Sequence, residues 1–177
     1  MASGLPVVLL ASSRPRGNTF ALARLAFVED QVRLIDLGRH CIAYYDYEPA
    51  RDDDFIALVR TIIDAPLWIL ATPLYWYTMS AQAKTFIDRL SDLLERHRDL
   101  GHALRGKGFA VVCSGTDAQL PSGFDEPFVL TCNYLGMRYL GSHYGRFTGD
   151  AFALPDTAAD AAAFGRQVEA DCRSDTR

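Results

Sequence analysis

Five short segments typical of strands, most of them apolar, alternate with helical patterns along this chain, and this alternation is the strongest constraint on its fold. The strand segments fall at residues 6–11, 32–37, 67–71, 108–113 and 137–144. Helical spacing, caps or composition predict helices at residues 19–28, 55–62, 80–94, 127–135 and 157–172. Strands that alternate with helices predict an α/β fold, a doubly wound parallel sheet.

The order of the five strands follows from the length of the chain and its first turn. The 177 residues suit one domain, residues 1–177, with a frayed tail after about Arg173. The first strand-to-helix turn lacks G-x-G-x-x-G, so the flavodoxin-like order 2-1-3-4-5 is favoured. Ligands of such sheets bind at the carboxyl ends of the strands. The loops that matter are therefore residues 12–19, residues 72–79 and the segment from residue 114 onward.

Composition excludes several classes of function. A net charge of −4 offers no basic surface for nucleic acid. No apolar run approaches the ~20 residues that span a bilayer, and no basic segment precedes the first apolar run as in a signal peptide. The four scattered cysteines, without a C-x-x-C pair, indicate no metal site. We expect a cytoplasmic protein that binds neither nucleic acid, membrane nor metal, with Cys113 in its core.

The loop at residues 12–19, Ser-Ser-Arg-Pro-Arg-Gly-Asn-Thr, has the features of an anion site. Unpaired N–H groups and the helix dipole favour negative charge where a helix begins. Ser12, Ser13 and Thr19 add hydroxyls, Gly17 permits a close turn, and Asn18 is a suitable N-cap. The loop matches no nucleotide P-loop, and hydroxyls without lysine suit one terminal phosphate, as in flavin mononucleotide (FMN). The alternative is an ordinary strand-to-helix connection capped by Asn18.

The loop after the third strand segment carries three consecutive aromatic residues, Tyr75, Trp76 and Tyr77. Exposed aromatics at the sheet's switch point suit a flat ring system such as isoalloxazine. Pro73 stiffens the entry, and N–H groups from Leu74 to Tyr77 are candidates to meet N5 and O4 of the ring. The alternative is an apolar patch used for oligomerisation, and one loop can serve both.

The loop after the fourth strand segment, at residues 114–117, is built of small residues. Ser114, Gly115 and Thr116 let the backbone approach a ligand closely. Their N–H groups are candidates for the pyrimidine edge of a flavin. Alone this signal is weak, but it falls at the third expected position.

Residues 12–19 and the longer run 72–90, Thr-Pro-Leu-Tyr-Trp-Tyr-Thr-Met-Ser-Ala-Gln-Ala-Lys-Thr-Phe-Ile-Asp-Arg-Leu, resemble the NAD(P)H-dependent FMN reductases of the flavodoxin-like superfamily. The resemblance extends from the first strand to about Tyr144. It implies bound FMN, NAD(P)H as electron donor, a small acceptor such as a flavin or quinone, and a homodimer or homotetramer. Relatives often carry Pro at the position of Ala81 and Leu or Met at that of Ala83, which concerns helix packing.

The resemblance also selects the site residues. The predicted cofactor-binding set is Ser12, Ser13, Arg14, Gly17, Asn18, Thr19, Pro73, Leu74, Tyr75, Trp76, Tyr77, Ser114, Gly115 and Thr116. Arg16 stands where relatives often carry Asp, Lys or Asn, and it either contacts the phosphate or points to solvent. We predict no catalytic side chain, because the flavin N5 would carry the chemistry.

Several finer interpretations stay open at this point. Phe124 and Phe128 are candidates to close an acceptor site, and His143 is either a proton donor there or a structural histidine. The acidic run at residues 52–54 is interpreted as a solvated loop with a helix cap. Arg14, Arg16 and Arg51 are equal candidates for the 2′-phosphate that distinguishes NADPH from NADH. The rival functions are a flavodoxin-type carrier of single electrons between proteins and a flavin-free member of the fold.

Overall fold

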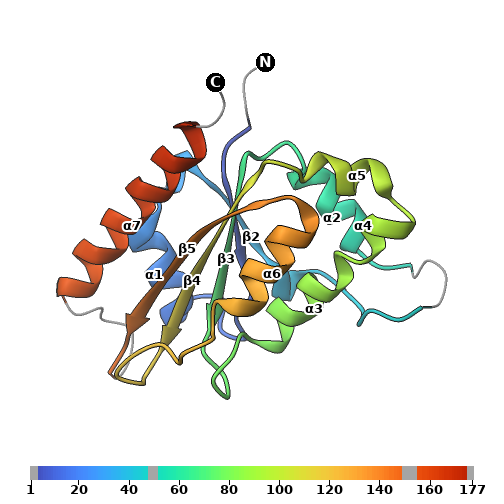
Figure 1. The fold of residues 1–177 in the computed structure, drawn as a ribbon. Coiled ribbons are helices and arrows are strands. Elements are labelled where there is room, and N and C mark those ends of the chain that lie inside the picture. Colours follow the sequence, from blue (N-terminus) through green and yellow to red (C-terminus); the bar gives the residue numbers. More distant parts are fainter. Residues whose placement is uncertain (1–3, 48–51, 149–154, 175–177) are drawn as a thin grey trace.

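The computed structural model describes residues 4–47, 52–148 and 155–174, and a five-stranded parallel sheet lies at its centre (Figure 1). Its strands are β1 (Val7–Leu10), β2 (Arg33–Asp36), β3 (Leu67–Pro73), β4 (Gly108–Gly115) and β5 (Arg138–Arg146). They lie in the order β2-β1-β3-β4-β5, and each neighbouring pair is parallel. The predicted flavodoxin-like fold and strand order are confirmed.

Helices cover both faces of this sheet. They are α1 (Asn18–Ala26), α2 (Phe55–Ile62), α3 (Ala81–Arg89), α4 (Asp92–Glu95), α5 (Arg98–Ala103), α6 (Glu126–Leu135) and α7 (Pro155–Ser174), with 3₁₀ turns η1 (Glu29–Gln31) and η2 (Leu37–Arg39). Helices α1 and α7 lie against one face, and α2 to α6 lie on the other (Figure 1). No helix among the described residues combines the length and apolar character needed to cross a membrane.

The core consists of two apolar layers, one on each face of the sheet. Val7 and Leu9 of β1 belong to the layer under α2, α3 and α6, whereas Val8 and Leu10 belong to the layer under α1 and α7. This division follows from the two-residue period of a strand. Because β1, β3 and β4 are covered on both faces, their sequences are almost continuously apolar. A rigid central sheet thus fixes where its carboxyl-end loops emerge.

Two predicted helix features are confirmed by burial and by backbone geometry. The four apolar residues of α2 that recur at helical spacing are all buried: Phe55, Leu58, Val59 and Ile62. Helix α6 ends at Gly136, whose φ of 70° places it in the left-handed region that glycine adopts without cost.

The predicted continuous helix from Ser80 to Leu94 is wrong beyond Arg89. Ser80 caps α3 as expected, because its hydroxyl accepts a hydrogen bond from the N–H of Ala83. After Arg89 the backbone bonds shift to three-residue spacing, as in Leu90 N–H to the Ile87 carbonyl at 3.1 Å. The chain then turns into the short helices α4 and α5, and Leu94 is exposed rather than part of the apolar face.

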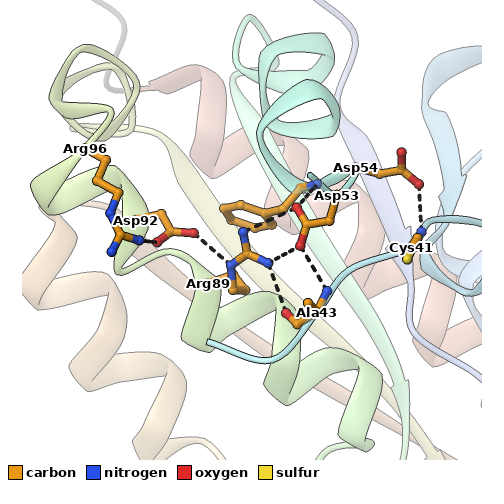
Figure 2. Close-up of polar contacts among 8 residues, drawn as sticks. Cys41, Ala43, Asp53, Asp54, Arg89, Asp92 and Arg96 are labelled. Carbon is orange, nitrogen blue, oxygen red and sulfur yellow. Dashed lines mark hydrogen bonds and ion pairs between the residues drawn. The ribbon is translucent and has the colours of Figure 1, made fainter. Parts of the chain in front are cut away.

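The interpretation of residues 52–54 as a solvated loop is wrong for Asp53. Its side chain is only 4% exposed and forms an ion pair with Arg89 of α3, whose own side chain is 6% exposed (Figure 2). Arg89 also donates to Asp92 at 2.8 Å and to the Ala43 carbonyl at 3.0 Å. Its guanidinium carbon lies 4.8 Å from the centre of the Phe55 ring. Arg89 therefore fastens the segment before α2 to α3.

The acidic run still caps α2, but the capping side chain is that of Asp53, one residue before the N-cap position Asp54. Asp53 accepts a hydrogen bond from the N–H of Phe55 at 3.1 Å. Asp54 instead accepts from the N–H of Cys41 at 2.7 Å (Figure 2). Burial alone would raise the pKa of Asp53, but the bonds from Arg89 and from backbone N–H groups outweigh it and hold that pKa below its ordinary value.

The last strand and the last helix both extend further than predicted. Strand β5 continues to Arg146, and α7 includes Ser174. The remainder of the tail that we expected to fray, residues 175–177, lies outside the described residues, as does Arg51.

Candidate functional site

Three predicted loops meet at one edge of the sheet because β1, β3 and β4 are adjacent and parallel. Leu10 pairs with Ala71, and Pro73 pairs with Ser114, so the strands end side by side. A hollow of about 340 Å³ lies there. Its lining consists of Ser12, Arg14, Gly17, Asn18, Thr19, Pro73, Leu74, Tyr75, Ser114, Gly115 and Thr116. All eleven belong to the predicted cofactor-binding set. That they bind the cofactor stays a prediction.

The first loop forms a tight turn that leads directly into α1. The N–H of Gly17 donates to the Arg14 carbonyl at 3.0 Å, and the Ser12 hydroxyl lies 3.3 Å from both the N and the O of Arg14. A Cβ on Gly17 would lie 3.0 Å from that of Arg14, so glycine suits this close turn. The prediction that Asn18 caps α1 is wrong: Gly17 occupies the N-cap, and no side chain caps the helix.

An uncapped helix end leaves donors for a ligand. The first N–H groups of α1 have no partner within the helix, and they carry the positive end of its dipole. Arg14 lines the same hollow, and it has no ion-pair partner within the described part of the chain. None of the eleven lining residues is an aspartate or glutamate. This donor set, one cation and no carboxylate at a helix N-terminus, fits a phosphate group.

A buried hydrogen bond joins the first loop to the third. The hydroxyls of Thr19 and Ser114 lie 2.8 Å apart, and these residues are 2% and 4% exposed. The Thr19 hydroxyl thus also serves the scaffold, since it shares this hydrogen bond with Ser114.

The aromatic loop is a tight hairpin turn. Tyr75 and Thr78 exchange backbone hydrogen bonds of 2.9 and 3.1 Å, and the two residues between them have left-handed φ values, 48° for Trp76 and 67° for Tyr77. Positive φ at both central positions is the type I′ geometry, which Asn-Gly normally adopts. Trp76 is 91% exposed and Tyr77 is 69% exposed. The turn therefore presents two large rings to solvent at a cost in backbone strain.

The same turn determines which backbone donors remain. We expected N–H groups from Leu74 to Tyr77 to be available, but two of them are engaged. Leu74 donates to the Ser114 carbonyl at 2.7 Å, and Tyr75 donates to Thr78. The N–H groups of Trp76 and Tyr77 have no partner within the described residues. The donors at the tip of the turn are thus the ones left for a ligand.

Two polar side chains fix the ends of this turn. The Thr72 hydroxyl accepts a hydrogen bond from the Ser80 N–H at 2.9 Å, which closes the loop at its base. The Ser80 hydroxyl donates to the Ala11 carbonyl at 2.7 Å, which ties it to the end of β1. Both residues are buried. Sequence reasoning named Ser80 only as a helix start and assigned no role to Thr72.

The third loop is held from β5 by residues that the sequence did not single out. Tyr144 donates to the Asp117 carbonyl at 3.0 Å, and Arg146 donates to the Thr116 carbonyl at 3.2 Å. Burial, followed by the neighbouring Asp117, raises the pKa of Tyr144, so its hydroxyl stays protonated as a donor. A Cβ on Gly115 would lie 2.7 Å from the Tyr144 oxygen. The only sequence signal for Tyr144 and Arg146 was that polar residues stand at the end of a predicted strand.

Some predicted residues are not part of the lining of the hollow. Ser13, Trp76 and Tyr77 are exposed and do not line it. Phe124 and Phe128 do not close it, because both are buried in the core, where the Phe128 ring stacks on Phe109 at 6.3 Å.

His143 does not reach the ligand edge either. It lies three residues before the end of β5, where its ring stacks on Phe164 of α7 at 5.6 Å. Burial lowers its pKa, with Asp160 opposing, so it is held neutral. Its Nε2 is buried without a hydrogen-bond partner in the described chain, so it is a packed histidine rather than a satisfied one.

Comparisons with known proteins agree with this arrangement. The model of the family described as NADPH-dependent FMN reductase matches residues 6–148. YwqN from Bacillus subtilis strain 168, named as a candidate NAD(P)H-dependent FMN-containing oxidoreductase, is 28% identical in an alignment 172 residues long that covers 88% of this chain and 92% of YwqN. KefF from Enterobacter sp. strain 638, an ancillary protein of a glutathione-regulated potassium-efflux system, is 30% identical over 63% of this chain and 68% of its own. The solved structure of a Trp repressor binding protein from Bacillus subtilis superposes with a TM-score of 0.73 at 25% identity, covering 90% of this chain and 96% of that one.

Proposed function

The chain belongs to the NADPH-dependent FMN reductase family, and from that premise we propose that it transfers a hydride from NAD(P)H through bound FMN to a small acceptor such as a flavin or quinone. FMN is its cofactor. The observation that carries the proposal is the hollow where the three loops meet, which pairs an uncapped helix N-terminus with an unpaired arginine and no carboxylate.

The two sides of the hollow suit the two ends of the cofactor. The N–H groups that begin α1, with Ser12 and Arg14, would hold the phosphate. Pro73, Leu74 and Gly115 on the far side offer apolar and backbone surface for a flat ring. When bound, FMN supplies two-electron chemistry that no side chain here provides.

The residues of this chain would position and shield rather than react. The unpartnered N–H groups of Trp76 and Tyr77 would bond a ring edge, and their exposed side chains would contact an acceptor. His143 is neutral and packed on α7, and the Tyr144 hydroxyl is bonded to Asp117. We assign no general acid or base among the described residues.

The protein is also proposed to be a homodimer or homotetramer. An apolar hollow of about 340 Å³ lies between α3, the turn into α4, and α6, and it includes Leu94, Leu130 and Tyr134 among the exposed apolar residues of the fold. A second copy covering it would bury this surface. Sedimentation should show an oligomer that Leu130→Glu disrupts, and a wild-type monomer at micromolar concentration would contradict the proposal.

The function is tested by a visible spectrum of the purified protein with FMN, before and after anaerobic addition of NADPH. Protein-bound flavin bands that NADPH bleaches support a reductase. Bound flavin that resists NAD(P)H but accepts single electrons from a chemical reductant would instead favour the flavodoxin-type carrier. A protein that retains no flavin would be a flavin-free member of the fold.

A further inference from the structure

Three successive carbonyl groups of the third loop point toward the end of β5. Strands β4 and β5 pair as far as Gly115 and Arg146, and the hydrogen bonding continues past that point. The carbonyls of Gly115, Thr116 and Asp117 accept, in turn, from the Phe147 N–H at 2.9 Å, the Arg146 Nε at 3.2 Å and the Tyr144 hydroxyl at 3.0 Å. The last two donors are side chains, so they hold the loop where strand pairing has ended.

This arrangement also decides where the N–H groups of the loop point. The carbonyl oxygen and the amide hydrogen of a trans peptide lie on opposite sides of its C–N bond, and the described residues contain no cis peptide. Because the carbonyls of Gly115 and Thr116 point toward β5, the N–H groups of Thr116 and Asp117 point away from it, to the side on which β3 lies. The hollow proposed to bind FMN is on that side, and neither N–H has a partner within the described residues. The loop therefore offers two backbone donors to a ligand.

Arg146 brings a positive charge to this loop. It is exposed, its Nε is bonded to the Thr116 carbonyl, and it has no ion-pair partner within the part of the chain that the structure describes. The acid of the loop, Asp117, is exposed and is not ion-paired with Arg146. Burial and then Asp117 raise the pKa of Tyr144, whereas Arg146 lowers it, so both charges act on this loop. Of the two charged groups, the guanidinium is the one hydrogen-bonded to the loop backbone.

A cation at one end of a peptide group strengthens the donor at the other end. The guanidinium at the Thr116 carbonyl polarises the peptide between Thr116 and Asp117, whose N–H points the opposite way. A polarised N–H gains more from an anionic acceptor than from a neutral one. Two-electron reduction adds negative charge to the pyrimidine edge of a flavin, and a charge near that edge tunes the flavin's electronics. Arg146 should therefore contribute more to the binding of reduced FMN than to that of oxidised FMN.

We propose that Arg146 acts through the Thr116 carbonyl to favour the reduced form of bound FMN over the oxidised form, while Tyr144 holds the same loop without adding charge. Both are positioning residues, since neither lines the hollow. The inference rests on the proposed function and names a residue that sets how readily the cofactor accepts electrons. An arginine stays charged at every physiological pH, so this effect does not depend on its titration.

The midpoint potential of bound FMN tests the proposal and is measured without turnover, by anaerobic equilibration with a reference dye. Arg146→Gln keeps an N–H donor but loses the charge, and we expect the reduced form to bind about fivefold more weakly relative to the oxidised form. That change corresponds to a potential about 20 mV lower, because a tenfold change is about 30 mV for two electrons. Arg146→Lys keeps the charge and should retain most of the potential. The matched control is Arg105→Gln, at an exposed arginine just before β4 and so at the opposite edge of the sheet, and it should leave the potential unchanged.

Tyr144→Phe separates the position of the loop from its charge. This variant loses the hydrogen bond to the Asp117 carbonyl, so the Kd for oxidised FMN should rise about threefold or more. The potential should stay near that of the wild type, because the oxidised and reduced forms lose the same support. A fluorescence titration measures this Kd, and urea unfolding checks that each variant is folded.

The outcomes separate this inference from the function on which it rests. A wild-type potential in Arg146→Gln would overturn the inference, as would an equal shift in Arg146→Lys, Tyr144→Phe or Arg105→Gln. If NADPH reduces the bound FMN but the potential does not depend on the charge at residue 146, the function stands and the inference is wrong. If the bound FMN resists NAD(P)H yet its potential depends on that charge, the inference stands and the function is wrong. A protein that binds no FMN would contradict both.

Discussion

Thr19 and Ser114 lie 95 residues apart in the chain, yet their hydroxyls share a buried hydrogen bond of 2.8 Å, and both residues line the hollow proposed to bind FMN. Thr19 belongs to the first turn of α1, and Ser114 lies near the end of β4. The bond fixes the proposed phosphate-binding helix end relative to the loop beside the proposed ring site. It thus constrains the distance between the two parts of the proposed cofactor site.

Removing one of these hydroxyls should cost more than removing both. We expect Thr19→Val to lower the free energy of unfolding by about 1–3 kcal/mol, because it leaves the buried Ser114 hydroxyl without a partner. Thr19→Val/Ser114→Ala should recover most of that loss. Urea unfolding of the three proteins measures both values. A double variant no more stable than Thr19→Val would show that the two hydroxyls do not interact in solution.

Asn18→Asp should change stability and cofactor affinity in opposite directions. A carboxylate at the first residue of α1 interacts favourably with the helix dipole, by about 0.3–1 kcal/mol in the FMN-free protein. The same charge would repel the phosphate of FMN, and we expect its Kd to rise about tenfold or more. Unfolding of the FMN-free protein and a fluorescence titration with FMN measure the two effects. Asn18→Ser is the control without charge, and an unchanged Kd for Asn18→Asp would contradict the phosphate site.

Asp53→Asn should strongly destabilise the fold, since it weakens the pairing of a cation that is 6% exposed. Arg89 would keep Asp92 as a partner, so we expect a loss of about 3 kcal/mol, the lower end for breaking a buried ion pair. The control is Asp88→Asn, whose pair with Lys84 is about half exposed and worth about 0.5 kcal/mol or less. Equal losses of unfolding free energy in the two variants, measured by urea unfolding, would contradict a stabilising buried ion pair between Asp53 and Arg89.

The lowered pKa of Asp53 also predicts that the stability of the fold depends on pH. The pKa of Asp53 is lowered in the folded protein, so its ionised form stabilises the fold above the unfolded-state pKa of about 3.9. That contribution is lost as the pH falls through the lower, folded pKa. We therefore expect the free energy of unfolding to decrease more steeply below about pH 4 in the wild-type protein than in Asp53→Asn. Parallel pH profiles would contradict this assignment.

The fold could be predicted from the sequence because the spacing of the apolar residues and the local helix caps agree with the packing in the structure. The apolar run of β3, the cap at Ser80 and the terminating Gly136 all act within a few residues. The interpretation failed where a partner distant in sequence decides the outcome. Asp53 looked solvated because nothing near it in sequence reveals Arg89, 36 residues away.

The candidate site, too, could be predicted only in part. The lining of the hollow proposed to bind FMN could be located because parallel strands bring their carboxyl ends together, whatever the side chains. The donors that remain free could not be predicted, because hydrogen bonds that form only in the folded loops engage the N–H groups of Leu74 and Tyr75. Phe124 and Phe128 were misassigned for a related reason: aromatic residues after a ligand loop serve the core equally well, and here Phe124 in the turn before α6 and Phe128 within α6 are both buried.

The aromatic hairpin allows backbone and side-chain roles to be separated. Asn and Gly at positions 76 and 77 favour the type I′ turn that Trp76 and Tyr77 adopt under strain. Trp76→Asn/Tyr77→Gly should therefore raise the free energy of unfolding by about 1–2 kcal/mol while keeping the turn and its N–H donors. If the rings contact the acceptor, KM for a quinone should rise about tenfold, while Kd for FMN changes far less. Trp76→Phe/Tyr77→Phe retains two rings on the strained turn and should keep a KM near that of the wild type. A normal quinone KM in the Asn-Gly variant would exclude these rings from the acceptor site, and a large loss of FMN would assign them to the cofactor instead.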